Sequence, residues 1–435
     1  MLTPSAGHQV RFHAHACLGI ESEREILLMD PWLFGTVFNN SWTVCPAPDL
    51  ETLDFGRVRH IWISHEHPDH LHVPSLQLIR SRVSGPISAY FGCQRRPAVA
   101  DALRQLGFSV TELVPHRETV MADGVRGTLF PTGEDSALVL RFGDRAILDQ
   151  NDCSLAPDEL AVLRRMFPRL DAWFFQFSLG GYYANPDDRA GLARARTHHL
   201  GLVADYFAAL RPAIFVPFAS FFYFSKDANC FLNDWTVTPA QLVQALPTLP
   251  TQILRPGDTL LWEAWADRNA TNLEYWRTIE RAPRVIAPHP PVEEDTLLAA
   301  GRSFLSEVAR EGAANRGPGE THLEILESGR ALALDCRNAR IEIVPRGDPR
   351  KLAITAPADE LLYFLRSRQG ASVFYASCFR VANPRRWLRL RRFRHALSRG
   401  TAGERSAIIR MHLARLDRAY LGGVIRRWHR RLTRP

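Results

Sequence analysis

The 435-residue sequence predicts an α/β fold, followed by a smaller α+β domain and a basic helical tail. Short apolar runs alternate with turn signals, and stretches with helical periodicity fall between them. The strand-like runs lie at Val10–Phe12, Ile26–Met29, His60–Ser64, Ala137–Phe142, Ala146–Asp149, Ala172–Phe177 and Ile214–Pro217, and the helical stretches lie at Ala98–Leu106, Pro157–Met166, Leu200–Leu210 and Pro239–Leu246. This alternation predicts packed sheets with helices outside them, in a first domain over residues 1–265.

A second, smaller domain is expected after a linker. From residue 266 to residue 294 the sequence loses its periodicity and gathers prolines, which predicts a linker there. An α+β domain is expected over residues 295–384, with four strands and two helices. The strands are expected at Leu323–Leu326, Ala331–Cys336, Ile341–Val344 and Leu352–Thr355, and the helices at about Glu294–Glu311 and at Ala358–Arg366.

The positive charge is concentrated in a basic tail, residues 385–435. The whole chain has 54 basic and 46 acidic residues and a formal net charge of +8. The tail holds 16 arginines and two acidic residues, so residues 1–384 are mildly acidic and do not favour nucleic-acid chemistry. Apolar residues at near-helical spacing from about Glu404 to Leu432 predict an Arg-rich helix. Such a helix can dock an acidic partner or an anionic membrane surface, contact nucleic acid, or pack on the protein body.

Neither a membrane span nor a secretion signal is predicted. No apolar run reaches the length of a membrane-spanning helix, and residues 1–9 lack a charged start and an apolar stretch. The seven cysteines are scattered and include no CxxC pair, which favours reduced thiols over a disulfide framework. We therefore expect a cytoplasmic protein.

The most informative motif follows the apolar strand that ends at Ser64. It reads His65-Glu66-His67-Pro68-Asp69-His70, an HxHxDH spacing. His65 and His67 can face one metal ion, while Asp69 and His70 begin the next turn and can face a second. Imidazole and carboxylate ligands suit Zn, Fe or Mn. The alternative is a chance cluster of histidines in a loop, which the restrictive spacing after a strand disfavours.

In this motif the sequence resembles the metallo-β-lactamase superfamily. The resemblance implies an αββα sandwich with a mono- or dinuclear metal site at the sheet edges. It also implies that Asp152, in Asn151-Asp152-Cys153, bridges two metal ions. His15 would lie near the mouth of the site, and Asp30, in Asp30-Pro31-Trp32, would orient a histidine ligand. A buried histidine bonded to the backbone is the alternative for His15.

Within the superfamily the chain more closely resembles the catalytic half of the CMP-N-acetylneuraminate hydroxylase family. Several short segments carry this resemblance, and in their order they fall within residues 10 to 235. They are Asp30-Pro31-Trp32, Asp135-Ser136-Ala137, Asn151-Asp152-Cys153, Gln176-Phe177-Ser178-Leu179-Gly180-Gly181 and Pro217-Phe218-Ala219-Ser220-Phe221.

A third metal-binding histidine, typical of the hydrolases of the superfamily, is missing. They place it between the HxHxDH motif and the bridging aspartate, where this chain has Glu134 and Asp135. The chain resembles the oxygen-activating members in carrying a carboxylate there. This resemblance implies iron rather than zinc, because an anionic set of ligands stabilises Fe(III). Glu134 is the candidate ligand and Asp135 an alternative, unless both lie in an exposed turn.

The last histidine ligand of most relatives is missing as well. Phe218-Ala219-Ser220 follows the strand Ile214–Pro217, and Lys226 stands where the hydroxylases often have a histidine. A protonated lysine is a poor metal ligand, but Lys226 can hold an anionic substrate. His198 and His199, at the start of an expected helix, can restore the imidazole or can be solvated.

These observations lead to a dinuclear-iron oxygenase or hydroxylase as the first expectation. The expected metal ligands are His65, His67, Asp69, His70, Glu134 and Asp152, and the expected catalytic residues are Asp69, His15 and Lys226. They would bind two divalent transition-metal ions, iron with zinc or manganese as alternatives. The resemblance implies an N-acetylated nucleotide sugar as substrate. Because the chain has no C-x-H and C-x-x-H pair, we expect a separate Rieske or ferredoxin protein to supply electrons.

Two other classes of protein remain open. A metal-dependent hydrolase would use activated water against a phosphodiester, lactone or amide, with Asp69 orienting the water. The missing third histidine disfavours a standard dizinc hydrolase. A degenerate site would leave a non-catalytic binding protein, although the complete HxHxDH motif argues against this reading.

Overall fold

The computed structural model describes residues 7–92, 98–133, 135–367 and 369–398. The chain divides into two compact units. The first holds most of the chain up to residue 285, and the second holds the remainder together with the short segments 181–188 and 226–230. None of the helices in the described part of the chain is both long enough and apolar enough to cross a membrane.

The first sheet of the first unit mixes antiparallel and parallel strands. β1, β2 and β3 pair antiparallel, whereas β3, β6, β7 and β8 pair parallel. In spatial order the strands are β1 (Gln9–Ala14), β2 (Cys17–Glu21), β3 (Ile26–Met29), β6 (Val58–Ile63), β7 (Ser88–Gly92) and β8 (Ser109–Leu113). The central strands β3 and β6 are largely buried apolar runs, as expected where both faces of a sheet are covered.

The second sheet has a similar mixture. β9 to β12 form an antiparallel meander, and β12, β13 and β14 pair parallel. In spatial order the strands are β14 (Ile214–Phe218), β13 (Ala172–Gln176), β12 (Arg145–Asn151), β11 (Asp135–Phe142), β10 (Val125–Thr132) and β9 (Glu118–Ala122).

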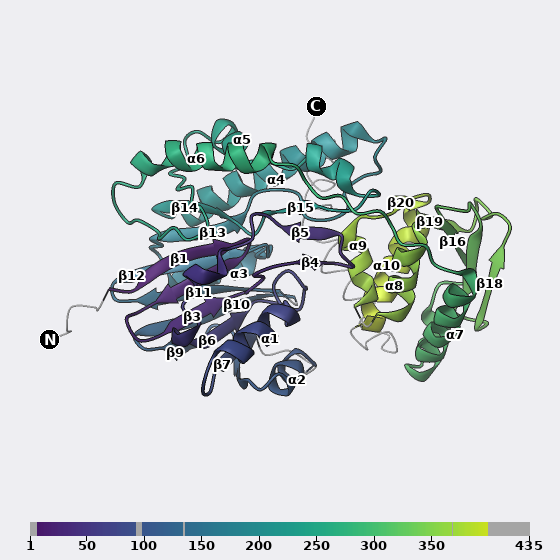
Figure 1. Ribbon diagram of the computed structural model, residues 1–435, viewed down its shortest axis with the longest axis horizontal. Helices are drawn as coiled ribbons and strands as arrows, with labels where there is room; N and C mark the ends of the chain where they lie inside the picture. The colour runs from purple at the N-terminus through teal and green to yellow at the C-terminus, as the bar shows by residue number, and fades with distance from the viewer. Residues whose placement is uncertain (1–6, 93–97, 134, 368, 399–435) are drawn as a thin grey trace, which may run out of the picture. The chain divides into compact units, whose positions relative to one another are not determined.

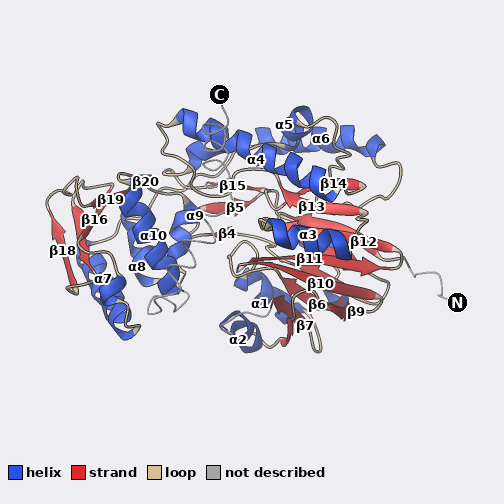
Figure 2. Ribbon diagram, turned by 180° about the vertical axis from the view of Figure 1, so that it is seen from behind, coloured by secondary structure: helices blue, strands red, loops and turns tan. Residues whose placement is uncertain are grey.

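Helices cover the outer face of each sheet, which makes the first unit an αββα sandwich (Figures 1 and 2). On the first sheet lie α1 (Val73–Arg82) and α2 (Ala98–Gln105), and on the second lie α3 (Pro157–Met166), α4 (Arg189–Leu210), α5 (Pro239–Ala245) and α6 (Ala266–Arg281). Large buried side chains such as Phe12, Trp62 and Phe174 fill the space between the sheets. The expected fold class is confirmed.

A small antiparallel sheet joins two segments that are far apart in the sequence. It contains β4 (Thr36–Val37), β5 (Trp42–Val44) and β15 (Phe222–Phe224). β5 pairs with both of the others. The pairing holds the loop after β3 beside the segment that follows β14.

The expectation of a linker is wrong for residues 266–281, which form α6. Trp276 anchors this helix on the first unit. Its ring stacks on Phe221 with centroids 4.4 Å apart, and its indole Nε1 donates to Leu254 O (3.0 Å). Asn272, also buried, donates to a backbone carbonyl at 2.7 Å. Because few buried residues stand among many polar ones, the helix shows little apolar periodicity in its sequence.

The second unit is built on a sheet with helices packed against it. In spatial order its strands are β18 (Arg340–Val344), β17 (Ala331–Asp335), β16 (Thr321–Ile325), β19 (Leu352–Ala356) and β20 (Arg380–Val381). β16 and β19 pair parallel, and the other pairs are antiparallel. The helices are α7 (Glu294–Arg310), α8 (Ala358–Arg366), α9 (Val373–Ala376) and α10 (Pro384–Ser398). Short 3₁₀ turns over both units lie at Leu50–Thr52, Phe55–Arg57, Cys230–Asp234, Ala314–Arg316 and Gly370–Ser372.

The first part of the expected basic tail belongs to the core of the second unit. α10 buries Leu390 and Phe393, and the guanidinium of Arg394 is buried as well. Arg394 Nε donates to Phe364 O (2.9 Å) near the end of α8, where helix carbonyls lack partners. The first part of this Arg-rich segment therefore forms a helix that packs in the core. The Arg-rich helix expected over residues 404–432 lies outside the described residues.

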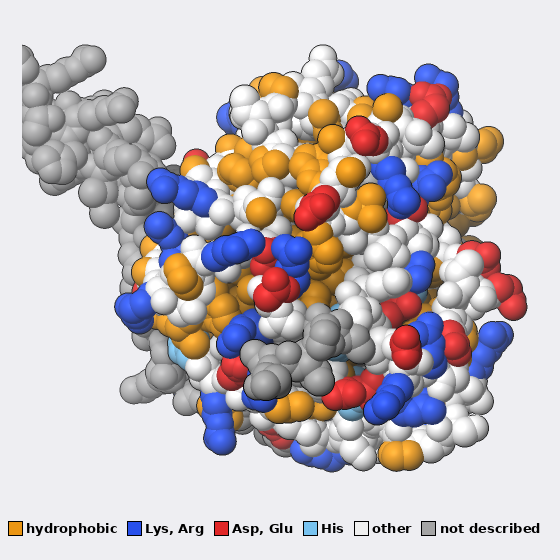
Figure 3. All heavy atoms as spheres, turned by 90° about the vertical axis from the view of Figure 1, so that its left-hand side faces the viewer, with side chains coloured by type: hydrophobic (Ala, Val, Ile, Leu, Met, Phe, Trp, Pro, Cys, Tyr) orange, Lys and Arg blue, Asp and Glu red, His pale blue; other side chains and the backbone are white. Residues whose placement is uncertain are grey.

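Charged side chains of both signs are mixed on the face of the molecule drawn in Figure 3. Blue and red side chains lie among apolar ones, and among the coloured side chains of this face neither sign forms one large patch. This face therefore offers a polyanion no extended basic surface.

Candidate metal centre

The HxHxDH motif lies in the loop that follows β6. β6 ends at Ile63, and His65, Asp69 and His70 are buried in the loop. His70 N donates to His67 O (2.9 Å), which folds the loop back on itself. The turn gathers the side chains of the motif at the carboxyl end of a parallel strand, where α/β sheets commonly bind ligands.

Two groups of histidine and aspartate side chains meet at this edge. In each group the ligand atoms lie within 4.8 Å of one another. The first group is His65, His67 and Asp152, and the second is His15, Asp69 and His70. Asp152 Oδ1 lies 3.8 Å from His65 Nε2 and 3.6 Å from His70 Nε2, so this carboxylate stands between the groups.

The remaining distances within the groups are equally short. His65 Nε2 lies 2.7 Å from His67 Nδ1. Asp69 Oδ2 lies 3.4 Å from His15 Nε2 and 3.6 Å from His70 Nε2. His15 reaches the site from the turn between β1 and β2, where its backbone takes a left-handed φ of 33°. Such strained residues cluster at functional sites.

Asp30 and Ser64 form a buried support for two of the histidines. Ser64 N donates to Asp30 Oδ1 (2.8 Å), and Ser64 Oγ donates to Asp30 Oδ2 (2.6 Å). Ser64 Oγ then accepts from His65 Nδ1 (2.9 Å), and Asp30 Oδ2 accepts from His70 Nδ1 (2.8 Å). Both rings therefore carry a proton on Nδ1, which leaves the Nε2 lone pairs of His65 and His70 for a metal ion.

Buried carboxylates make the site favour positive charge. Burial by itself would lower the pKa of His70, but the carboxylates of Asp152, Asp69 and Asp30 raise it to about 10. Burial lowers the pKa of His67 to about 4, with help from a neighbouring imidazole. A bound cation can therefore take the place of the proton on His70, while His67 is already neutral and ready to act as a ligand.

Several buried polar atoms of the two groups have no hydrogen-bond partner among the described residues. They are both ring nitrogens of His15, Asp69 Oδ1, His70 Nε2 and Asp152 Oδ1. An unpaired buried polar atom costs about 1–3 kcal/mol, so such a concentration indicates an interaction with something else. Imidazole and carboxylate atoms that converge in this way fit a pair of transition-metal ions.

Asp135 is a further carboxylate whose charge acts on the first group. It pairs with Thr132 at the end of the β10–β11 hairpin, and its charge acts to raise the pKa of His67 against the effect of burial. Glu134, the ligand expected from the sequence, lies outside the described residues. The hairpin therefore brings a carboxylate into the surroundings of His67.

Aromatic side chains border the two groups. The ring of Phe222 lies 5.6 Å from that of His15 and stacks on Trp42 at 3.9 Å, while the ring of Phe38 lies 6.3 Å from that of His67. Apolar rings at a charged site limit the access of water and strengthen its electrostatic interactions. Trp42 has no distinguishing signal in the sequence, because only the fold brings β5 beside β15.

Lys226 lies in the second unit and belongs to neither group of ligands. Its ammonium donates to Asp359 Oδ2 (2.5 Å) and to Glu360 Oε1 (3.0 Å) in the first turn of α8. His289 Nδ1 lies 2.7 Å from Asp359 Oδ1. Lys226 is buried in this cluster, where its charge balances two carboxylates. The substrate-binding role expected from the sequence stays a prediction.

His198 and His199 belong to neither group. α4 begins at Arg189, so both histidines lie inside the helix rather than at its start. His199 is buried, and burial together with the charge of His198 lowers its pKa to about 4.

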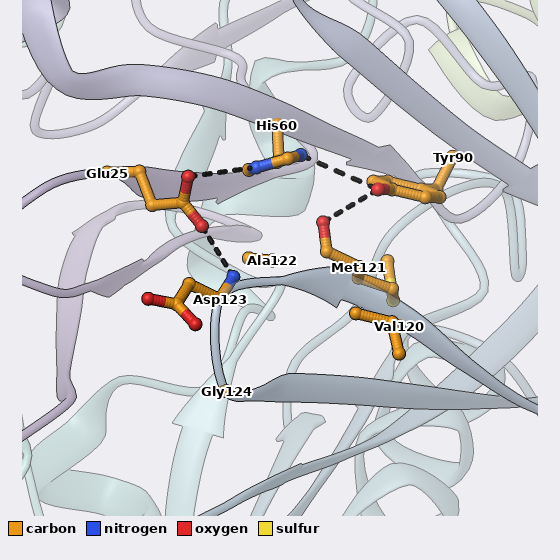
Figure 4. A pocket seen from close by; sticks show the side chains of 8 residues that line it. All are labelled: Glu25, His60, Tyr90, Val120, Met121, Ala122, Asp123 and Gly124. Atoms are coloured by element: carbon orange, nitrogen blue, oxygen red, sulfur yellow. Dashed lines mark hydrogen bonds and ion pairs between the residues drawn. The ribbon is translucent and has the colours of Figure 1, made fainter. Parts of the chain in front are cut away.

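A separate hollow of about 340 Å³ lies beside β9 (Figure 4). It is lined by Glu25, His60, Tyr90, Val120, Met121, Ala122, Asp123 and Gly124. Glu25 Oε2 lies 3.3 Å from His60 Nε2, and the Tyr90 hydroxyl donates to Met121 O (2.7 Å). These polar groups satisfy one another, and none of them belongs to the two ligand groups.

Sequence reasoning missed three buried polar residues that support the ligands: Ser64, Ser136 and Asn151. Serine and asparagine are common in turns, so at the ends of strands they read as boundary residues. Their only distinguishing signal is position, because each lies at or next to the end of an apolar strand.

No family model matches the sequence. Among curated proteins the chain is similar to cytidine monophosphate-N-acetylneuraminic acid hydroxylases. The protein of Cricetulus griseus is 26% identical over 276 residues, which cover 58% of this chain and 48% of the relative. That of Danio rerio is 26% identical over 249 residues, which cover 52% of this chain and 41% of the relative. The chain spans about half the length of the curated relatives it matches.

Solved structures are similar at lower sequence identity. A mutant of the CmlA beta-hydroxylase is 18% identical with a TM-score of 0.42, over 59% of this chain and 54% of that chain. The metallo-beta-lactamase fold protein YhfI from Bacillus subtilis is 12% identical with a TM-score of 0.39, over 59% of this chain and 97% of that chain. The curated relatives confirm the predicted resemblance of this chain to the cytidine monophosphate-N-acetylneuraminic acid hydroxylases.

Proposed function

We propose that the chain is a metal-dependent oxygenase, a hydroxylase that uses O₂ and two iron ions. His65, His67 and Asp152 would hold one ion, and Asp69 and His70 the other, with Asp152 shared and His15 beside the second. A bound iron pair would supply the activation of O₂.

The observation that carries this proposal is the carboxylate near His67. Asp135 is the first residue of β11, beside the turn of the β10–β11 hairpin, and its charge acts to raise the pKa of His67. The hydrolases that the chain resembles have an imidazole in this part of the sequence. An additional carboxylate favours iron over zinc because it stabilises Fe(III). The similarity to hydroxylases over 276 residues agrees with this choice.

The chain's own residues would orient the ligands, move a proton and exclude water. Asp30 and Ser64 bond the Nδ1 atoms of His70 and His65, so that Nε2 of each ring would face a bound ion. His15 Nε2, 3.4 Å from Asp69 Oδ2, can exchange a proton with that carboxylate or with a bound substrate. The aromatic rings beside the site keep bulk water from a reactive centre.

The substrate and the partners belong to the same proposal. An N-acetylated nucleotide sugar is the proposed substrate, because the curated relatives are named as hydroxylases of such a compound. A Rieske or ferredoxin protein is the proposed electron donor. The Arg-rich residues 399–435 would dock an acidic donor or an anionic membrane surface.

Exchange of the carboxylate for an imidazole tests the metal preference. Asp135→His should shift the preference of the protein toward zinc, and it should lower O₂ consumption with a chemical reductant at least tenfold. Asp144→His is the matched control, because Asp144 is highly exposed in the β11–β12 turn. Unchanged O₂ consumption and iron content in Asp135→His would contradict the proposal.

A metal-dependent hydrolase is the second candidate, favoured by the four imidazoles of the two groups. A bound zinc pair would supply an activated water. Turnover of a phosphodiester, lactone or amide by the zinc-loaded protein, with no reductant and no O₂, would establish this candidate in place of the first.

A further inference from the structure

Ser136 lies where the two sheets of the first unit meet at the metal centre. It is the second residue of β11, and it is buried. Its hydroxyl donates across the sandwich to Ser64 O (2.6 Å), and its carbonyl accepts from Asn151 Nδ2 (3.0 Å). We propose that Ser136 is a positioning residue that fixes the spacing between the ligands of the first sheet and Asp152 of the second. This inference rests on the proposed metal centre.

On the side of the first sheet, the hydrogen bond from Ser136 reaches Ser64, which supports two ligands. Ser64 binds both carboxylate oxygens of Asp30, and its hydroxyl also lies 2.9 Å from His65 Nδ1. Asp30 in turn lies 2.8 Å from His70 Nδ1. A displacement of Ser64 would therefore move one histidine of each group.

On the side of the second sheet, the side chain of Asn151 connects Ser136 to Asp152. Asn151 is fully buried with a left-handed φ of 44°, and its side chain makes two bonds. Oδ1 accepts from Asp152 N (2.7 Å), while Nδ2 donates to Ser136 O. Gln176 donates to Asp152 O at 2.7 Å. The backbone that carries the shared carboxylate is thus tied to β11 at Ser136.

The strand register explains why side chains make these links. The pairing of β11 with β12 runs from Phe142 and Arg145 to Leu138 and Asp149. Beyond that pair the Asn151 amide joins the two strands. On the other side of β11, the partner of Ser136 is Pro131, which has no N–H to donate.

The spacing between the two sheets decides whether Asp152 reaches both groups. Its Oδ1 lies 3.8 Å from His65 Nε2 and 3.6 Å from His70 Nε2. Ligand distances of about 2.0–2.2 Å tolerate errors of only about 0.2 Å. Loss of one hydrogen bond between the sheets should therefore weaken the shared carboxylate as a ligand. Changes in residues that support ligands typically lower metal affinity about 10–100-fold.

Cobalt titration of the full chain tests the inference. Ser136→Ala removes the hydroxyl and keeps the carbonyl, while Ser136→Thr keeps both. The matched control is Ser178→Ala, because Ser178 is buried in the same unit and its hydroxyl accepts from Val237 N (2.7 Å), a bond that involves none of the candidate ligands. Co(II) binding is followed by visible absorption, the interaction between two bound ions by electron paramagnetic resonance, and folding by thermal unfolding.

The expected result separates the four proteins. The wild-type chain, Ser136→Thr and Ser178→Ala bind two Co(II) ions that interact magnetically. Ser136→Ala binds the second ion at least tenfold more weakly and loses the magnetic interaction. Unchanged binding by Ser136→Ala, an equal loss in Ser178→Ala, or failure of Ser136→Thr to restore binding would each overturn the inference. A wild-type chain that binds no Co(II) would instead overturn the proposed function, and the inference with it.

Discussion

Asp30 and Ser64 determine how two histidines present themselves to a metal ion. Asp30 accepts bonds from Ser64 N, Ser64 Oγ and His70 Nδ1, so both of its carboxylate oxygens have partners in this buried position. The HxHxDH spacing identifies candidate ligands but says nothing of which nitrogen of each ring would face a metal ion. That choice follows from residues 30 and 64, which the fold brings together from the ends of β3 and β6.

Lys226 is a buried cation of the second unit. Removal of its ammonium would leave Asp359 and Glu360 buried without this counter-charge. Lys226→Met should therefore lower the free energy of unfolding of the second unit by about 3–5 kcal/mol, measured by urea unfolding. Lys351→Met is the matched control, because Lys351 forms its ion pair with Glu320 at the surface. A similarly small loss in both variants would contradict this role.

The same cluster sets limits on the pH range of stability. Burial opposes ionisation of Asp359, but bonds from His289 and Lys226 lower its pKa, so its contribution is lost as the pH falls through that lowered pKa. Burial opposes the charge of Lys226, but Glu360 and Asp359 raise its pKa, so its contribution is lost only as the pH rises above that raised pKa. From about pH 7 to pH 9 the difference in stability between wild type and Lys226→Met should be constant, whereas at lower pH the buried carboxylates of the variant should take up protons and narrow the difference. A strong pH dependence within this range would contradict the argument.

At the scale of elements, α6 is the helix whose packing on the first unit was not expected. Trp276→Ala should cost about 3–5 kcal/mol of unfolding free energy, because it empties the space beside Phe221 and removes a buried hydrogen bond. Thr278→Ala, on the exposed side of the same helix, should change stability by less than about 0.5 kcal/mol. Equal effects in chemical denaturation would mean that residues 266–281 behave as a linker.

The elements that the sequence predicted well have a local signal. β6 is an apolar run that ends in the HxHxDH motif, and α3 has a proline in its first turn and clear apolar periodicity. α6 was missed, and the burial of α10 was only one of several alternatives for the predicted tail, because their buried residues depend on partners elsewhere in the chain, such as Phe221 and Phe364. Local patterns cannot reveal such partners.

The residues of the candidate site also differ in how far the sequence could predict them. Four of its residues stand in one motif, and the resemblance added His15, Asp30 and Asp152. The link through Ser136 was not predictable, because it depends on the register of β11 against β10 and β12 and on the contact between the two sheets. The role expected for Lys226 came from its place in the sequence, while its two carboxylate partners lie more than 130 residues away.

At the scale of the whole molecule, the basic residues divide between a packed helix and the segment beyond it. A chain that ends after Ser398 keeps α10 and should unfold within a few degrees of wild type. A chain that ends after Asn383 loses Leu390, Phe393 and Arg394 from the second core and should not fold there. If residues 399–435 dock an electron donor, the chain that ends after Ser398 should lose activity with a protein donor and keep it with a small reductant. Full activity with the protein donor would exclude the docking role.

The iron and zinc content of the purified wild-type chain, after expression with both metals supplied, bears most directly on the proposed iron centre. A dinuclear-iron oxygenase held by the two groups around Asp152 predicts close to two iron ions per chain and O₂ consumption that depends on reductant. Protein that contains zinc, no iron, and consumes no O₂ with reductant would contradict it.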